Sequence, residues 1–238
     1  KYHINDNEYF SKFLPLYYRD VVSKNRDESL TEKQRLNDGP IVVDFDFRYT
    51  LETRSKQYTD NDVKLMISEY REELKNIFQF TDTPFPVYIF EKPNVNRLEE
   101  KNVTKDGIHM IIGIQSDRET QMLLREAMIE RLQKIWGHLP LINTFEDVLD
   151  KGISQGTTNW QLYGSKKPNH DTYRLTHVFE FDFDENDDDF IESVTNIRKF
   201  DYNKDFQKLS VRYNDHPYFF LSDSFIPIHN EYKEKNSE

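Results

Sequence analysis

Apolar residues recur along this chain with the spacings of helices and of strands. Between Asp60 and Phe80 they fall three or four residues apart, which predicts a helix with one buried face. Its apolar positions are Val63, Met66, Ile67, Tyr70, Leu74, Ile77 and Phe78. A second helix is predicted between a capping box at Ser116 and Glu119 and the helix-breaking Gly137.

Five shorter runs are rich in the β-branched and aromatic residues that favour strands. They cover residues 39–48, 87–91, 108–114, 160–163 and 174–183. Because strands and helices alternate along the chain, we expect an α/β (α+β) fold, with mixed β-sheets flanked by helices around a cleft.

The remaining segments define the expected organisation of the chain. Residues 1–38 are expected to form an N-terminal helical and loop segment, in which the aromatic stretch 8–22 is a helix or a pair of helices interrupted by Pro15. Residues 39–230 are expected to form one folded domain. The polar residues 231–238 are expected to be a disordered tail.

Composition excludes several classes of function. The formal net charge is −11, which excludes a uniformly basic nucleic-acid-binding surface. A local basic groove is not excluded, because the negative charge is unevenly distributed: seven carboxylates lie within residues 180–189. The chain has no cysteine, which excludes disulfides, cysteine-bound zinc and a thiol nucleophile. No apolar run approaches the roughly 18 residues of a membrane span, and no signal peptide opens the chain. We therefore expect an intracellular protein that is not secreted and has no membrane partner.

The predicted strand at 39–48 carries two carboxylates on one face. Asp44 and Asp46 are two positions apart, so in an extended chain they point to the same side, about 7 Å from each other, while Phe45 points to the opposite side. Like charges this close repel unless a cation or a proton neutralises them, so the pair suits divalent cations and phosphate chemistry. The alternative is the solvent-facing edge of an amphipathic strand.

A second cluster, Lys105, Gly107 and His109, leads into the apolar run 108–114. An ammonium group, a backbone amide at a glycine and an imidazole N–H can together hold a polyphosphate. The alternative is a hairpin turn before a core strand, in which His109 makes a structural hydrogen bond.

A third cluster is the turn at residues 164–168, with the sequence Gly-Ser-Lys-Lys-Pro. Its amides, hydroxyl and ammonium groups suit phosphate oxygens, although a solvated turn would have the same composition. Asp150 precedes this turn, near the end of a short helix that is predicted to begin at Thr144–Asp147. Taken alone, Asp150 is an ordinary acid at a helix end.

A second Asp-x-Asp pair, Asp182 and Asp184, also follows aromatic strand residues. It runs directly into further acidic residues, a density of charge that two cations could not neutralise. We therefore interpret this pair as the solvated end of a strand.

In this order along the chain, the three clusters and Asp150 resemble the motifs of the archaeo-eukaryotic primase superfamily, whose members carry a strand-borne Asp-x-Asp/Glu, then a small-x-His motif, then a lone Asp. The sequence is similar in particular to the primase domains of poxvirus-type primase–helicases of large DNA viruses and to the PrimPol enzymes. The matching segments are Asp44-Phe-Asp-Phe-Arg-Tyr49, Lys105-Asp-Gly-Ile-His109 and Asn159-Trp-Gln-Leu-Tyr-Gly-Ser-Lys-Lys-Pro168, which lie within residues 40–168.

The resemblance implies a primase-polymerase catalytic domain that uses two divalent cations, Mg²⁺ or Mn²⁺. Asp44, Asp46 and Asp150 would be the catalytic, metal-binding residues, with Asp147 as a rival for the third position. The implied nucleotide-binding residues are Arg48, Lys105, Gly107, His109, Ser165, Lys166 and Lys167. The family often has Ser where this chain has Gly107, so the resemblance implies that the backbone amide serves here in place of a hydroxyl.

The implied function is DNA-templated nucleotidyl transfer, which makes or extends primers from nucleoside triphosphates on a single-stranded template. The domain would be joined to a helicase domain in a viral primase–helicase, in the host cytoplasm or at a viral replication site. Two alternatives stay open at this point. They are a non-catalytic nucleic-acid-binding module of a replication protein and another metal-dependent phosphotransferase or nuclease.

Overall fold

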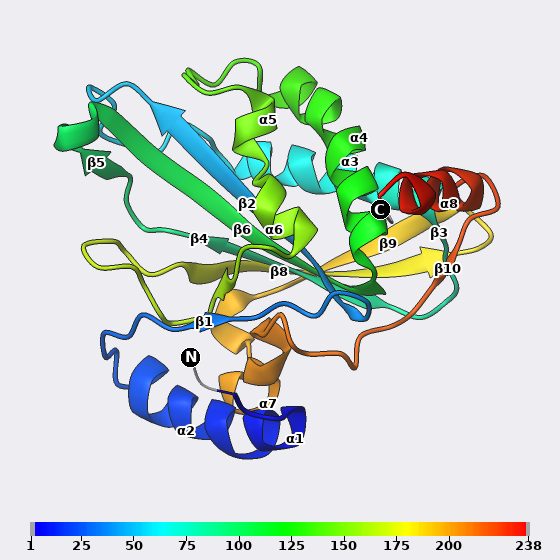
Figure 1. Ribbon diagram of the computed structural model, residues 1–238, viewed down its shortest axis with the longest axis horizontal. Helices are drawn as coiled ribbons and strands as arrows, with labels where there is room; N and C mark the ends of the chain where they lie inside the picture. Colours follow the sequence, from blue (N-terminus) through cyan, green and yellow to red (C-terminus); the bar gives the residue numbers. More distant parts are fainter. Residues whose placement is uncertain (1–2, 237–238) are drawn as a thin grey trace.

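The computed structural model describes residues 3–236 and has an α/β architecture (Figure 1). The helices are α1 (Asp6–Glu8), α2 (Leu14–Tyr17), α3 (Asp60–Ile77), α4 (Arg118–Trp136), α5 (Phe145–Val148), α6 (Lys151–Gln155), α7 (Tyr202–Asp205) and α8 (Ile226–Lys235). The strands are β1 (Thr31–Glu32), β2 (Gly39–Tyr49), β3 (Phe78–Gln79), β4 (Phe85–Glu91), β5 (Asn96–Leu98), β6 (Val103–Ser116), β7 (Trp160–Gln161), β8 (Arg174–Asp184), β9 (Asp189–Thr195) and β10 (Phe220–Leu221). The predicted fold class, with helices flanking sheets, is confirmed.

One six-stranded sheet organises the molecule. Its order is β2-β6-β4-β8-β9, with β5 paired to β6, and two-stranded sheets form from β1 with β7 and from β10 with β3. Within residues 3–236 every pairing between these strands is antiparallel, so the prediction of mixed sheets is wrong. The reason is that β6 inserts between β2 and β4 and runs antiparallel to both.

The two faces of this sheet pack against different layers. The long helices α3 and α4 lie on one face, and the N-terminal helical segment lies with α7 on the other side (Figure 1). On the first face, Phe45 and Phe47 each lie 5.3 Å from the Trp136 ring, measured between ring centroids, and all three side chains are fully buried. Because alternate residues of β2 are anchored in this core, Asp44 and Asp46 must point to the opposite face.

Strand β2 lies at the edge of the six-stranded sheet, and other parts of the chain satisfy its outer backbone groups. Gln121 of α4 bonds the amide of Val42 and the carbonyl of Pro40. Asn143 accepts from the amide of Arg48 and donates to the carbonyl of Asp46. The segment 142–150 therefore runs beside the strand that carries the two aspartates.

The N-terminal segment is helical from Asp6 to Val22, as the sequence predicts for residues 8–22. Helices α1 and α2 are joined and followed by wider, π-type turns, and Pro15 lies in the first turn of α2, where its missing N–H is tolerated. Pairing of β1 with β7 attaches this segment to the part of the chain that carries the third cluster.

Two helix starts differ from the prediction. Asp117, rather than Ser116, caps α4 by accepting from the Thr120 amide at 2.9 Å, because Ser116 is still paired in β6. The single short helix predicted near residues 144–151 is two helices, α5 and α6, separated at Leu149 and Asp150. Strand β9 was not predicted.

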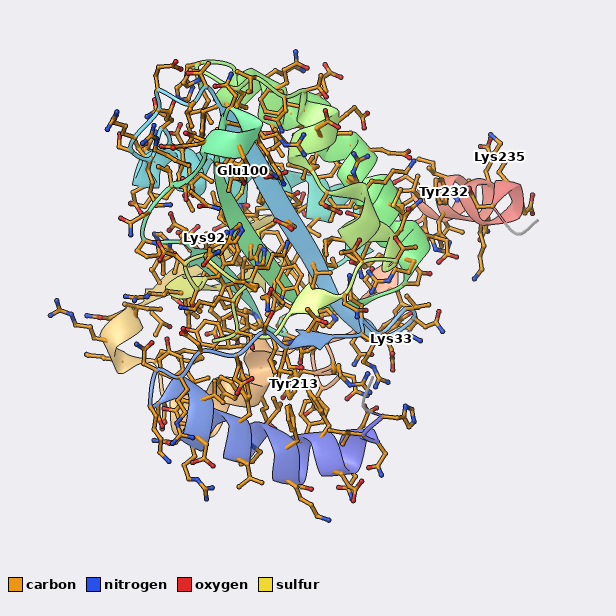
Figure 2. The ribbon with its side chains drawn as sticks, turned by 60° about the vertical axis from the view of Figure 1, so that its left-hand side comes forward. Lys33, Lys92, Glu100, Tyr213, Tyr232 and Lys235 are labelled. Carbon is orange, nitrogen blue, oxygen red and sulfur yellow. The ribbon has the colours of Figure 1, made fainter. Side chains whose placement is uncertain are left out.

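Helix α8 occupies most of the segment for which the sequence predicts a disordered tail, so that prediction is wrong for residues 231–235. It is ordered because His229 is buried and its Nε2 bonds Asp117 Oδ2 at 2.8 Å. Figure 2 shows α8 at one margin of the molecule, with Tyr232 and Lys235 on it. Residues 237 and 238 lie outside the described residues. None of the helices in residues 3–236 combines the length and apolar character that crossing a membrane requires.

Candidate active site

The pairing of β2 with β6 brings the first two predicted clusters onto one face of the sheet. Three cross-strand pairs share that face: Asp44 with His109, Asp46 with Gly107, and Arg48 with Lys105. The two carboxylates therefore lie directly beside the imidazole and the ammonium group, although these two groups belong to a segment about sixty residues later in the chain.

Asp46 is held between two cations. Its Oδ2 accepts from the Arg48 guanidinium at 2.9 Å and from Lys105 Nζ at 3.0 Å. All three side chains are partly exposed, so they remain open to solvent and to a ligand.

Asp44 is as partly exposed as Asp46 but faces a different set of cations. Its Oδ1 is 3.5 Å from His109 Nε2. Burial alone would raise the pKa of Asp44, but His109, Lys167 and Lys92 outweigh burial and lower that pKa below its ordinary value. Asp44 is therefore a carboxylate at neutral pH.

A third acid, Asp150, is joined to the same strand through its backbone. The Asp150 amide donates to the carbonyl of Asp44 at 3.0 Å, and Leu149 forms a β-bridge with Phe45. The Asp150 side chain caps α6 by accepting from the Ile153 amide at 2.8 Å.

The rival acid, Asp147, lies on α5 with an exposed side chain that is hydrogen-bonded to Thr144. The buried Arg125 guanidinium donates to the carbonyls of Leu149 and Glu146, at 2.9 and 2.7 Å, and so holds the connection between α5 and α6 against β2. Of the two candidates, Asp150 is the one whose backbone is bonded beside Asp44.

Gly107 has no room for any side chain. A Cβ built at this position would lie 2.6 Å from the carbonyl oxygen of Phe45 and 2.7 Å from the Tyr173 hydroxyl. The backbone amide of Gly107 donates to Asp106 Oδ1 at 2.8 Å. That amide already has an acceptor within the chain, and its expected contact with a triphosphate stays a prediction.

The third cluster points partly away from the acids. Gly164 adopts a φ of +88°, in the left-handed region that favours glycine, and this turn directs Ser165 inward. The Ser165 hydroxyl is buried, lies 2.7 Å from the Tyr17 hydroxyl and accepts from the Leu30 amide. Ser165 therefore anchors the turn to the N-terminal segment, and its role as a phosphate contact stays a prediction.

The two lysines of this turn differ. Lys166 Nζ pairs with Asp27 at 2.8 Å, on the side of the N-terminal segment, and its role as a nucleotide contact stays a prediction. Lys167 is exposed, and its charge helps to lower the pKa of Asp44. Of the two lysines, Lys167 is the one whose charge acts on Asp44.

Sequence reasoning missed Lys92, which directly follows β4. Lys92 Nζ lies 4.7 Å from the centroid of the Tyr173 ring. Burial lowers the pKa of Lys92, and Lys167 adds to that effect, while Asp44 opposes it. The alternation of β4 could have identified this residue, because positions 88, 90 and 92 share one face.

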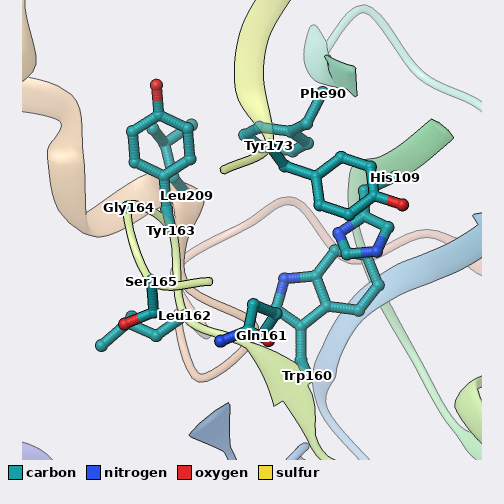
Figure 3. A pocket seen from close by; sticks show the side chains of 10 residues that line it. All are labelled: Phe90, His109, Trp160, Gln161, Leu162, Tyr163, Gly164, Ser165, Tyr173 and Leu209. Carbon is teal, nitrogen blue, oxygen red and sulfur yellow. The ribbon is translucent and has the colours of Figure 1, made fainter. Parts of the chain in front are cut away.

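Two aromatic side chains complete the site. Figure 3 shows the imidazole of His109 between the Tyr173 ring and the Trp160 indole. Trp160 is buried. The cavity beside these residues has a volume of about 10 Å³, enough for one water molecule and far too small for a nucleotide.

The donor set fits a hard divalent cation. Carboxylate oxygens on one face of a strand, with no sulfur ligand, are the groups that Mg²⁺ and Mn²⁺ prefer. Within residues 3–236, three potential ligand atoms come within 4.8 Å of one another only at Asp117, Glu119 and His229, at the start of α4. Binding between Asp44, Asp46 and Asp150 would thus require their side chains to converge on the ion.

Comparisons with known proteins match the greater part of this chain. A family model described as "C962R protein N-terminal AEP domain", in which AEP stands for archaeo-eukaryotic primase, matches residues 1–179. A protein of Acanthamoeba polyphaga mimivirus named "Putative helicase L207/L206" is 32% identical over 184 residues. That alignment covers 75% of this chain but 18% of the mimivirus protein.

Proposed function

This chain belongs to the archaeo-eukaryotic primase family, and we propose that it is a template-directed nucleotidyltransferase that makes or extends primers from nucleoside triphosphates. The observation that carries the proposal is the register of β2 and β6, which sets Asp44 and Asp46 on the same face as Lys105 and His109. This arrangement joins an acidic half, suited to cations, with a basic half, suited to a triphosphate.

Asp44, Asp46 and Asp150 are the residues proposed to hold two divalent cations, either Mg²⁺ or Mn²⁺. When bound, such ions would lower the pKa of the attacking hydroxyl and neutralise the triphosphate and the leaving pyrophosphate. The deprotonated state of Asp44 supports this role, because a carboxylate that is already ionised binds a cation without first losing a proton.

The remaining charged residues would orient the incoming nucleotide. Arg48 and Lys105 now neutralise Asp46, and they would be free to contact phosphate oxygens once a cation takes over that neutralisation. The charges of Lys167 and Lys92 act on Asp44, and both lysines would attract the same phosphates. His109 would offer an imidazole N–H from the cross-strand position beside Asp44.

The partners are proposed from the family and from the relative. A single-stranded DNA template would lie across the exposed side of the acids, held by few lysines, in keeping with the net charge of −11. Because the mimivirus relative bears the name of a helicase and is much longer than this match, we also propose a helicase domain or partner. The site of action would then be viral replication inside the host cell.

The test is incorporation of nucleotides on primed and unprimed single-stranded templates with Mn²⁺ or Mg²⁺. We expect wild-type protein to extend or make primers, and Asp44→Asn and Asp46→Asn to lose on the order of 10³-fold in rate. Full activity of both variants would contradict the metal assignment. Mn²⁺ binding with no incorporation on any template would indicate the non-catalytic module, and release of mononucleotides without added triphosphates would indicate a nuclease.

A further inference from the structure

Both faces of the His109 ring are covered by other rings. The centroid of the Tyr173 ring lies 3.6 Å from that of the imidazole, at 17° between planes, and the Trp160 indole lies 4.5 Å away at 40°. His109 is 8% exposed, and its Nε2 is directed at Asp44. Only the edge of this imidazole can therefore reach a ligand (Figure 3).

Tyr173 contacts two side chains of the site and lies close to Gly107. The Lys92 ammonium lies 4.7 Å from the centroid of its ring, and His109 stacks on that ring. Its hydroxyl lies 2.7 Å from the place where a Cβ at Gly107 would be. The absence of a side chain at Gly107 is thus what allows Tyr173 to lie flat over His109.

We propose that Tyr173 is a positioning residue, whose ring fixes the plane of the His109 imidazole so that its edge faces the triphosphate. This inference rests on the proposed function. A ring packed on both faces cannot rotate about its χ2 bond without opening a void, so the direction of its N–H groups is set before a nucleotide arrives. Tyr173 would then act through His109 and make no obligatory contact of its own with the nucleotide.

The first test is kinetic and uses the intact chain. We expect Tyr173→Phe to keep the ring and the activity within about twofold, and Tyr173→Leu to lower kcat/KM for the nucleotide by about 10- to 100-fold. In a His109→Ala background, Tyr173→Leu should cause no further loss, because a residue that acts through His109 has nothing left to position. A full additional loss in that background, or no loss from Tyr173→Leu alone, would overturn the proposal.

Tyr202→Leu is the matched control. Tyr202 is a partly buried ring in the same hydrophobic cluster as Tyr173, but it contacts Tyr163, Tyr18 and Phe200 rather than His109. We expect its removal to lower stability without the loss of kcat/KM. An equal loss in both leucine variants would show that the effect comes from packing alone and would overturn the positioning role.

The second test does not need activity. Ring protons that lie over an aromatic face resonate upfield, so the His109 ring signals in a proton NMR spectrum report the stacking directly. These signals can be assigned with His109→Ala among the seven histidines of the chain. We expect the same upfield position in wild type and Tyr173→Phe and a downfield change in folded Tyr173→Leu, in which Trp160 alone still covers the imidazole. If the wild type incorporates no nucleotide, the proposed function fails, while unchanged His109 signals in Tyr173→Leu would refute the positioning itself.

Discussion

Two Asp-x-Asp pairs lie on strands of the same sheet, yet their surroundings differ. His109 is paired opposite Asp44, and the carboxylate of Asp46 accepts hydrogen bonds from two cationic side chains, Arg48 and Lys105. Opposite Asp184 stands another acid, Asp189, where β8 turns into β9. The first pair is therefore surrounded by cations, and the second faces a like charge.

The second pair is the solvated end of a strand, as predicted from its acidic neighbours. Asp182 is exposed, and β8 ends at Asp184, whose carboxylate accepts from the backbone amide and the side chain of Asn186. These hydrogen bonds lower the pKa of Asp184, the backbone bond being the larger cause. The comparison teaches that the spacing of two acids does not make a site, whereas the residues paired across from them do.

Manganese binding should separate the two pairs most strongly. We expect Asp44→Asn/Asp46→Asn to weaken Mn²⁺ affinity by about 100-fold or more, because two anionic ligands are lost. Asp182→Asn/Asp184→Asn, which removes the same charge from the same sheet, should change that affinity by less than about twofold. Isothermal titration calorimetry of both double variants measures this difference. An equal loss of Mn²⁺ affinity in the two would mean that the cations around Asp44 and Asp46 do not distinguish this pair from Asp182 and Asp184.

The third acid provides the next largest effect. We expect Asp150→Asn to lower kcat/KM for incorporation by about 100-fold, because it removes a proposed ligand while asparagine still caps α6. Asp147→Asn, an exposed acid on α5, should stay within about twofold of wild type. Steady-state kinetics decides between them, and equal thermal midpoints show that the cap survives. A larger loss from Asp147→Asn than from Asp150→Asn would make Asp147 the third metal ligand in place of Asp150.

Strong local patterns explain what the sequence could predict. The alternation in β2 places Asp44 and Asp46 on one face, and the 3.6-residue period predicts α3. Both signals lie within one element and need no knowledge of distant partners.

The missed features depend on contacts between distant segments. Ser165 turns inward because its hydroxyl meets Tyr17, 148 residues earlier in the chain. Lys92 directly follows β4 and Tyr173 directly precedes β8, and the sequence does not state that β4 lies beside both β6 and β8. Strand β9 has an exposed, irregular pattern, so only its pairing with β8 identifies it.

Replacement of Lys92 tests whether the cationic side chains around the acids contribute to nucleotide binding. We expect Lys92→Met, which keeps the length of the side chain, to raise KM for the nucleotide about tenfold with a smaller change in kcat. The control is Lys134→Met, because Lys134 pairs with Glu130 on an exposed surface of α4. A Lys92→Met variant with unchanged KM would remove Lys92 from the site.

The smallest effect concerns Asp117, Glu119 and His229, whose ligand atoms lie within 4.8 Å of one another. Asp117 caps α4, and the positive end of a helix dipole disfavours a bound cation. Burial would raise the pKa of Asp117, but hydrogen bonds from Thr120 and the charge of His229 lower it. We therefore interpret this group as a structural contact, in which His229 of α8 is hydrogen-bonded to Asp117 at the start of α4.

We therefore expect His229→Leu to lower the free energy of unfolding by about 1–2 kcal/mol, because it leaves Asp117 without one of its donors. Mn²⁺ affinity should stay within about twofold in His229→Leu and in Glu119→Gln. Denaturant melts and calorimetry measure the two quantities separately. Weaker Mn²⁺ binding in both variants would mean that three close ligand atoms are enough to bind a cation even at a helix N-terminus. The pairing of β2 with β6 would then not be the feature that determines where the cation binds.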